Sequence, residues 1–180
     1  MAAWTHIEHT AISGGLPATT VTWTGISQSY DHLFLKISGR YSGSGSEAYR
    51  FDIVYNGDTS DSDYANTYIT STSVNYAVQS GRVGGRALAG YLTTSDFEAD
   101  TFASTVVWVP HYSNSTNYKQ MISQAVCPNT SEENNEWALR HCSTLFKENT
   151  DAITDISVVA GGGNNFVANS SFDLYGILGV

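Results

Sequence analysis

Residues 49–58 of the chain read YRFDIVYNGD, and this stretch predicts a β-strand followed by a tight turn. Apolar and polar positions alternate with a period of two, which is typical of a strand that buries one face. Arg50 and Asp52 are expected to point away from the core. The side chains expected to face it have odd numbers: Tyr49, Phe51, Ile53 and Tyr55. Asn56-Gly57 then favours a hairpin turn, because both residue types readily take positive φ.

The same alternation recurs along the chain and predicts a series of short strands. They are expected at residues 33–38, 102–109, 118–126, 137–141, 153–159 and 172–178. The predicted core is Leu33, Leu35, Ile37, Phe51, Ile53, Val106, Trp108, Ile122, Leu139, Ile156, Val158 and Leu174. If Trp108 is buried, removing its side chain should cost roughly 3–5 kcal/mol. Short strands with frequent Gly-rich turns and almost no helical periodicity predict an all-β fold. We expect an antiparallel, jelly-roll-like β-sandwich that forms a single domain over residues 1–180.

The composition supports a folded chain with an unusually uncharged surface. Charged residues make up 14% of the 180 residues, against about 25% in an average domain, while 41% are hydrophobic. A chain of this length buries roughly 70% of the surface that its unfolded form exposes, so its core needs no metal or disulfide. We therefore expect neither chelator nor reductant to change its thermal unfolding.

The net charge of −9 argues against two classes of partner. An acidic surface repels phosphate backbones and anionic lipid, so neither nucleic acid nor membrane is expected as a partner. The N-terminus has no basic region and no apolar run, so no signal peptide is expected. We therefore expect the chain to be made and kept in a cytoplasm. Cys127 and Cys142 are then expected as two buried free thiols, with a single disulfide as the alternative.

Two groups of residues could bind a metal, and for both another interpretation is favoured. His6 and His9 are three positions apart, which on a regular strand places their rings on opposite faces. Asp58, Asp61 and Asp63 resemble the start of a calcium loop, but the Gly and distant Glu of an EF-hand are missing, so a solvated acidic loop is expected. No metal or other cofactor is therefore predicted.

Catalytic signatures are missing from the sequence. It contains no Gly-x-Ser-x-Gly elbow, no His-Glu-x-x-His motif and no Gly-rich loop that leads into a Lys-Ser/Thr helix. No catalytic residue is assigned, and an enzyme is not expected.

Aromatic residues are abundant, with 4 Trp, 11 Tyr and 7 Phe. Tyr and Trp anchor protein interfaces and also stack on sugar rings, so the aromatic excess suits either assembly or glycan binding. Interface aromatics are expected mainly in Tyr64–Tyr76 and Tyr112–Tyr118. Aromatics buried between subunits would favour assembly, whereas an open aromatic row on one sheet would favour glycan binding.

The order of several strand and turn segments resembles that of a known group of proteins. These segments are residues 22–33, 51–59 with Tyr64 shortly after, and the C-terminal FDLYGI at residues 172–177. They resemble small β-sandwich virion proteins of tailed phages, notably phages of cyanobacteria and marine bacteria.

The resemblance implies a non-enzymatic structural protein on the exterior of a virion that assembles in the host cytoplasm. Capsid decoration is expected first, and a short-fibre or tail-associated role second. The implied partners are copies of itself, with a trimer favoured, and other virion proteins such as major capsid or tail proteins. The alternative function is a carbohydrate-binding module that recognises a host receptor.

Overall fold

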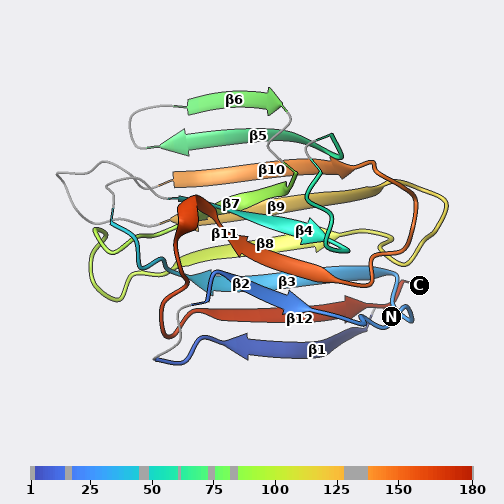
Figure 1. Ribbon diagram of the computed structural model, residues 1–180, viewed down its shortest axis with the longest axis horizontal. Coiled ribbons are helices and arrows are strands. Elements are labelled where there is room, and N and C mark those ends of the chain that lie inside the picture. Colours follow the sequence, from blue (N-terminus) through green and yellow to red (C-terminus); the bar gives the residue numbers. More distant parts are fainter. Residues whose placement is uncertain are drawn as a thin grey trace.

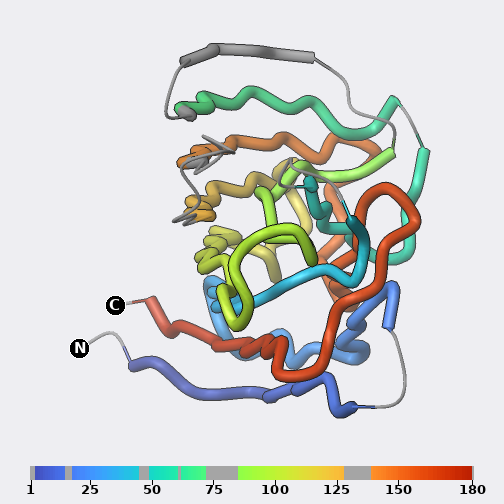
Figure 2. The backbone as a smooth tube through the Cα atoms, turned by 90° about the vertical axis from the view of Figure 1, so that its left-hand side faces the viewer, coloured from blue at the N-terminus to red at the C-terminus, as the bar shows by residue number. Residues whose placement is uncertain are grey.

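The computed structural model describes residues 3–14, 18–44, 49–60, 62–72, 76–81, 85–127 and 138–179. These residues form two antiparallel sheets that pack face to face, as Figures 1 and 2 show. The large sheet contains, in spatial order, β1 (Trp4–Ala11), β12 (Ser171–Ile177), β3 (His32–Gly39), β8 (Ala103–Val109), β9 (Lys119–Cys127), β10 (Ala138–Phe146), β5 (Tyr64–Thr72) and β6 (Tyr76–Gly81). The small sheet contains β2 (Thr20–Trp23), β11 (Ile156–Ala160), β4 (Tyr49–Tyr55) and β7 (Ala87–Leu92). The all-β sandwich is therefore confirmed.

The connections between the sheets follow the jelly-roll pattern. The chain stays in one sheet only from β5 to β6 and from β8 through β9 to β10, and it changes sheet between every other pair of consecutive strands. The strands β1-β12-β3-β8 thus face β2-β11-β4-β7, which is the double Greek-key wrapping of an eight-stranded jelly roll. Two strand pairs, β5–β6 and β9–β10, are inserted into this wrapping. Both extend the large sheet beyond β8, and they pair with each other through β5 and β10.

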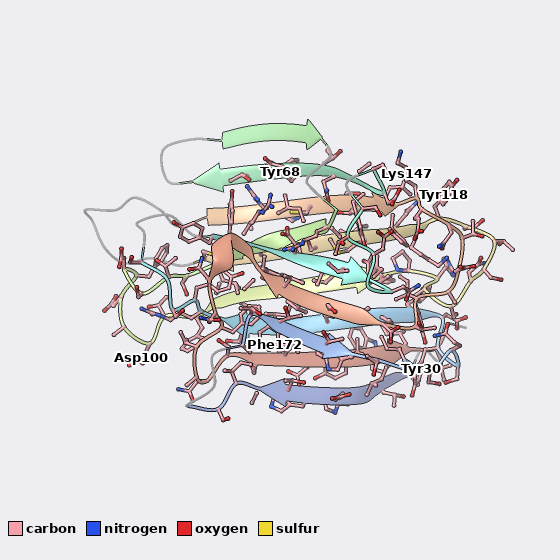
Figure 3. All side chains as sticks on the ribbon, in the orientation of Figure 1. Tyr30, Tyr68, Asp100, Tyr118, Lys147 and Phe172 are labelled. Atoms are coloured by element: carbon pink, nitrogen blue, oxygen red, sulfur yellow. The ribbon has the colours of Figure 1, made fainter. Side chains whose placement is uncertain are left out.

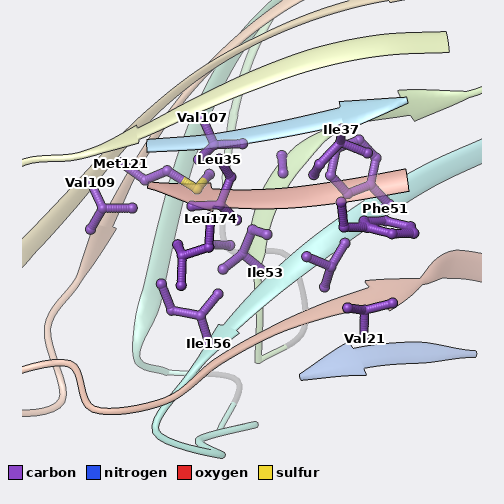
Figure 4. Packing of buried hydrophobic residues seen from close by; sticks show 14 of the residues in the cluster. Val21, Leu35, Ile37, Phe51, Ile53, Val107, Val109, Met121, Ile156 and Leu174 are labelled. Atoms are coloured by element: carbon purple, nitrogen blue, oxygen red, sulfur yellow. The ribbon is translucent and has the colours of Figure 1, made fainter. Parts of the chain in front are cut away.

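Apolar side chains from both sheets fill the space between them (Figure 4). The alternation predicted in β3 and β4 is confirmed, because their odd-numbered side chains face this core. The predicted core residues that the structure buries are Leu33, Leu35, Ile37, Phe51, Ile53, Ile156, Val158 and Leu174. The predicted turn after β4 is also confirmed, with φ of 50° at Asn56 and 72° at Gly57.

The remaining core predictions are wrong, and all of them lie in β8, β9 or β10. Val106 is only partly buried, whereas Trp108, Ile122 and Leu139 are exposed on the outer side of the large sheet. In each of these strands the even–odd alternation exists, but the residues of the opposite parity face inward.

A close approach between the sheets explains why large side chains are excluded from the inner side here. β7 crosses over β9, and a Cβ at Gly90 would lie 2.5 Å from the Cβ of Ala125 and 3.0 Å from the Phe51 ring. Small inward residues such as Ser123 and Ala125 fit under β7. The bulky Ile122 and Val126, which are adjacent to these positions, lie on the outer side, while the inward Met121 is buried in the core.

Candidate functional site

The inserted strands expose several apolar side chains on their outer side and bury some polar ones on their inner side. In β9 the inward positions include the buried Lys119 and Ser123, while Ile122 and Val126 point outward and are exposed. In β10 the buried Arg140 alternates with the exposed Leu139. A sheet that covers a core normally shows the opposite arrangement. The outer side of these strands therefore has the apolar character that is typical of a buried surface.

The exposed apolar side chains of β8, β9, β10 and β5 together form what we call the apolar face. Its members, with their exposed fractions, are Ile69 (51%), Trp108 (44%), Ile122 (60%), Val126 (43%) and Leu139 (39%). The strand register places Trp108 opposite Ile122, Val126 opposite Leu139, and Ile69 opposite His141. The apolar side chains thus lie on one side of four adjacent strands, with neutral polar residues such as Gln124 between them.

No formal charge lies among the described outward side chains of β8, β9, β10 and β5. Besides the apolar face, these side chains are Ala65, Thr67, Ser71, Ser104, Val106, Gln120, Gln124, His141, Ser143 and Leu145. Gln124 Nε2 lies 3.5 Å from His141 Nε2 near the middle of the group. A charge-free surface is unusual on a chain with a net charge of −9.

An aromatic row continues the apolar face toward β1. Tyr175 lies opposite Phe34, and Phe34 lies opposite Trp108, on successive strands of the large sheet. Trp4 packs edge-on against this row, with ring centroids 4.8 Å from Phe34 and 6.2 Å from Tyr175. We call Trp4, Phe34, Trp108 and Tyr175 the aromatic row. Because Trp4 contacts Phe34 and Tyr175 edge-on, part of these rings is already covered.

A buried polar network holds the inserted strands from beneath. The Arg140 guanidinium stacks over the rings of Tyr91 and Tyr68, 3.5 Å and 4.3 Å from their centroids, and Tyr68 lies on β5 (Figure 3). Arg140 Nε donates to Thr70 Oγ1 at 2.9 Å, and Arg140 Nη2 donates to the Tyr91 hydroxyl. Buried cations are stable only when paired or stacked in this way, so the network fixes β10 against β5 and β7.

Asn66 makes a second polar link in the same region. Its Oδ1 accepts from the Leu88 amide at 2.9 Å and from Thr144 Oγ1 at 2.6 Å, which connects β5 to β7 and β10. These hydrogen bonds explain how polar inward residues are tolerated under the inserted strands.

The aromatic residues expected at an interface are in part core residues. Tyr64 and Tyr112 are fully buried within the chain, so they cannot contact a partner. Tyr118 is exposed at the beginning of β9 (Figure 3), and the side chain of Tyr76 lies outside the described residues. The prediction is therefore wrong for Tyr64 and Tyr112, because side-chain type alone does not show the direction in which the backbone presents each ring.

A β-bulge changes the prediction for the N-terminal histidines. The register of β1 on β12 shifts between His6 and Glu8, so the rings of His6 and His9 lie on the same face. His9 Nδ1 lies 2.7 Å and His6 Nε2 3.3 Å from Asp173 Oδ1. The expectation that the two rings point to opposite faces is therefore wrong. No group of three potential metal ligands in the described part of the chain has the geometry of a metal site.

The acidic loop brings together Asp58 and Asp63, with Glu148 from the segment after β10. Hydrogen bonding to Asp58 and repulsion from its charge raise the pKa of Glu148. Burial favours a higher pKa for Asp58, but its hydrogen bonds with Ser60, Glu148 and Asp63 outweigh burial and lower it. Asp61, the remaining acidic residue of this predicted solvated loop, lies outside the described residues.

The two thiols are poorly placed both for a disulfide and for nucleophilic catalysis. Cys127 lies opposite Ala138 and Cys142 opposite Ser123, four residues along the same strand pair, or about 13 Å, so they cannot form a disulfide. Burial raises the pKa of Cys127 to about 12 and that of Cys142 to about 11, which disfavours the nucleophilic thiolates.

Asp52 is fully buried rather than solvated, although it points away from the core as predicted. Its carboxylate oxygens accept no hydrogen bond within the described part of the chain, and Arg50 Nε lies 3.5 Å from Oδ2. Burial raises the pKa of Asp52, while the charges of Arg50, Arg86 and Arg140 partly oppose this shift. Its unsatisfied oxygens cost stability, and no partner for proton transfer lies beside them.

Comparisons with known proteins add no family to this description. No protein-family model matches the sequence, and no curated protein matches it either. Within the described residues, no helix has the length and apolar character needed to cross a membrane.

Proposed function

We propose that the protein is a non-enzymatic structural protein on the exterior of a tailed-phage virion. It acts by associating with copies of itself and with other virion proteins, such as the major capsid or tail proteins. Capsid decoration is the leading role, and a short-fibre or tail-associated role is second. The observation that carries the proposal is the exposed apolar face, which lies on β8 and on three of the inserted strands.

The energetics of the apolar face favour association over catalysis. Soluble monomers rarely expose large contiguous apolar patches, and patches of this kind usually mark interaction sites. Ile122 and Val126 expose apolar surface to water, and burial of that surface against a partner would stabilise the complex. An assembled particle supplies that burial.

The fold and the sequence pattern support the particle assignment. The jelly roll is an architecture of viral capsid domains, although fold alone does not determine function. The order of segments at residues 22–33, 51–59 and 172–177 resembles that of small virion proteins of tailed phages. The fold and the segment order therefore agree on the same class of protein.

Particle fractionation tests the proposal. Phage particles from a lysate that contains the chain would be banded on a density gradient, and each fraction would be analysed by mass spectrometry and immunogold labelling. We expect the chain to band with intact particles, and the gold label to distinguish capsid from tail. Recovery of the chain in the soluble fraction, with particles that lack it, would contradict the proposal.

Carbohydrate recognition is the second candidate because of the aromatic row. Partly exposed Trp and Tyr side chains on a sheet can stack on sugar rings, and lectin domains also use the jelly roll. Two observations favour assembly instead. Trp4 and Phe34 cover part of each other's rings, and the row continues into the aliphatic Ile122 rather than into a polar cleft.

A glycan array with a matched variant separates the two functions. Binding of a defined glycan by the wild type, lost in Trp108→Ala and kept in Met121→Ala, would support carbohydrate recognition. We expect no glycan to depend on Trp108 in this way.

A further inference from the structure

We propose that the apolar face is covered by the same face of a second copy of this chain, related to the first by a two-fold axis. This inference rests on the proposed function, because it names the partner and the surface through which assembly begins. It follows from the charge, the size and the symmetry of the apolar face.

The charge distribution favours a second copy over most other partners. Two copies of a chain with a net charge of −9 repel each other at most approaches. The described outward side chains of β8, β9, β10 and β5 carry no formal charge, so this surface brings two copies together with the least repulsion. Gln124, His141 and Ser143 provide neutral groups that can donate or accept hydrogen bonds across the interface.

The size of the surface is that of a modest specific interface. The apolar face covers the outer side of four adjacent strands, β8, β9, β10 and β5, which at about 4.8 Å per strand is roughly 19 Å wide. A strand of about seven residues adds a length of roughly 23 Å, so the apolar face measures roughly 440 Å² per copy. Two copies would bury roughly 900 Å² through it, and contact with the adjoining aromatic row brings the total to about the 1,000 Å² that a specific interface needs.

The symmetry of the surface favours a dimer over a trimer. Two sheets pack face to face with their strands within about 30° of each other, and a two-fold axis through the contact uses one patch from each copy. A trimer around a three-fold axis needs two different complementary patches on each copy. The described residues show one uncharged patch with several exposed apolar side chains, so the two-fold arrangement uses what the chain offers.

Sedimentation velocity across about 0.1–100 μM protein tests the inference with three full-length chains. The wild type is compared with Ile122→Asp, which places a charge in the apolar face. Thr20→Asp is the matched control, because Thr20 is an exposed strand residue on the outer side of the small sheet. We expect a dimeric wild type, an unchanged Thr20→Asp and a dissociation constant raised at least about 100-fold in Ile122→Asp. Circular dichroism verifies that each variant is folded, and Ile122→Ala replaces Ile122→Asp if the charged variant does not fold.

Three results would overturn the inference. They are a wild type that stays monomeric over the whole concentration range, an Ile122 variant that dimerises as well as the wild type, and a control variant that dissociates equally. The outcome is independent of particle fractionation. A monomer that bands with particles would refute the two-fold pairing and leave the virion assignment intact, whereas a dimer found only in the soluble fraction would do the reverse.

Discussion

Met121 and Ile122 are adjacent on β9, yet truncating them to alanine should have opposite consequences. Met121 is 0% exposed between the two sheets, whereas Ile122 is 60% exposed on the apolar face. Met121→Ala should therefore destabilise each folded chain. Ile122→Ala should mainly weaken the contact between chains.

The expected magnitudes follow from these exposures. Truncating a buried Met to Ala costs about 2–5 kcal/mol, because transfer and cavity terms add. For a chain of this size, a loss of about 3 kcal/mol lowers the melting temperature by roughly 6–12 °C. Ile122 is less than half covered in the single chain, so its truncation should cost the folded monomer roughly 1 kcal/mol at most.

Association should show the reverse order. In a two-fold pair, each Ile122→Ala substitution counts twice, because both copies contribute the residue. Burial of the exposed part of two Ile side chains is worth about 2–3.5 kcal/mol, which is a roughly 30- to 300-fold change in the dissociation constant. Met121→Ala should leave the dissociation constant almost unchanged.

Urea denaturation at low and high protein concentration measures both effects. At concentrations where the wild type is monomeric, Met121→Ala should unfold at much lower urea than Ile122→Ala. At high concentration the wild type and Met121→Ala should gain stability by mass action, and Ile122→Ala should gain much less. If Ile122→Ala destabilises the monomer as much as Met121→Ala does, Ile122 faces the core and the orientation of β9 described above is wrong.

Three further predictions concern the interior. Burial raises the pKa of Asp52, so the folded state favours its neutral form. The free energy of unfolding of the wild type should therefore fall as the pH rises above about 4 and through that raised pKa. Unfolding free energies measured across the same pH range should show no such loss in Asp52→Asn. Gly90→Ala should cost about 1–3 kcal/mol in urea denaturation, because the new Cβ would meet Ala125 at 2.5 Å, and a stable variant would show that β7 can move away from β9. Cys127 and Cys142 should not react with iodoacetamide at pH 8 until the chain is unfolded, because burial holds both thiols protonated. Labelling of the native protein, detected by mass spectrometry, would contradict this.

The sequence was most informative where both neighbours of a strand lie in the central jelly roll. In β3 and β4 the apolar residues of one parity face the core, so period-two alternation identified the buried side correctly. The turn at Asn56-Gly57 was also predictable, because few other residue types accept its positive φ.

The inserted strands could not be predicted in the same way. Alternation shows that Ile122 and Ser123 lie on opposite sides of a sheet, but it does not show which side is covered. The usual assumption that the bulkier apolar side faces inward fails here, because β7 approaches β9 so closely at Ala125 that only a small residue fits at that inward position. Likewise, a one-residue bulge in β1 leaves no clear mark in the sequence, yet it decides that His6 and His9 share a face.

The strand order has a consequence for how the chain becomes structured during synthesis. β11 separates β2 from β4, and β12 separates β1 from β3, so β1 and β2 have no sheet partners until residues 156–177 emerge from the ribosome. Until then β1 and β2 have unpaired edges, and pairing across such long sequence separations is slow. Nascent chains that lie close together on one messenger RNA are therefore prone to exchange these strands or to aggregate. A ribosome-bound chain that stops before β11 should depend on chaperones for solubility, while the finished chain should not.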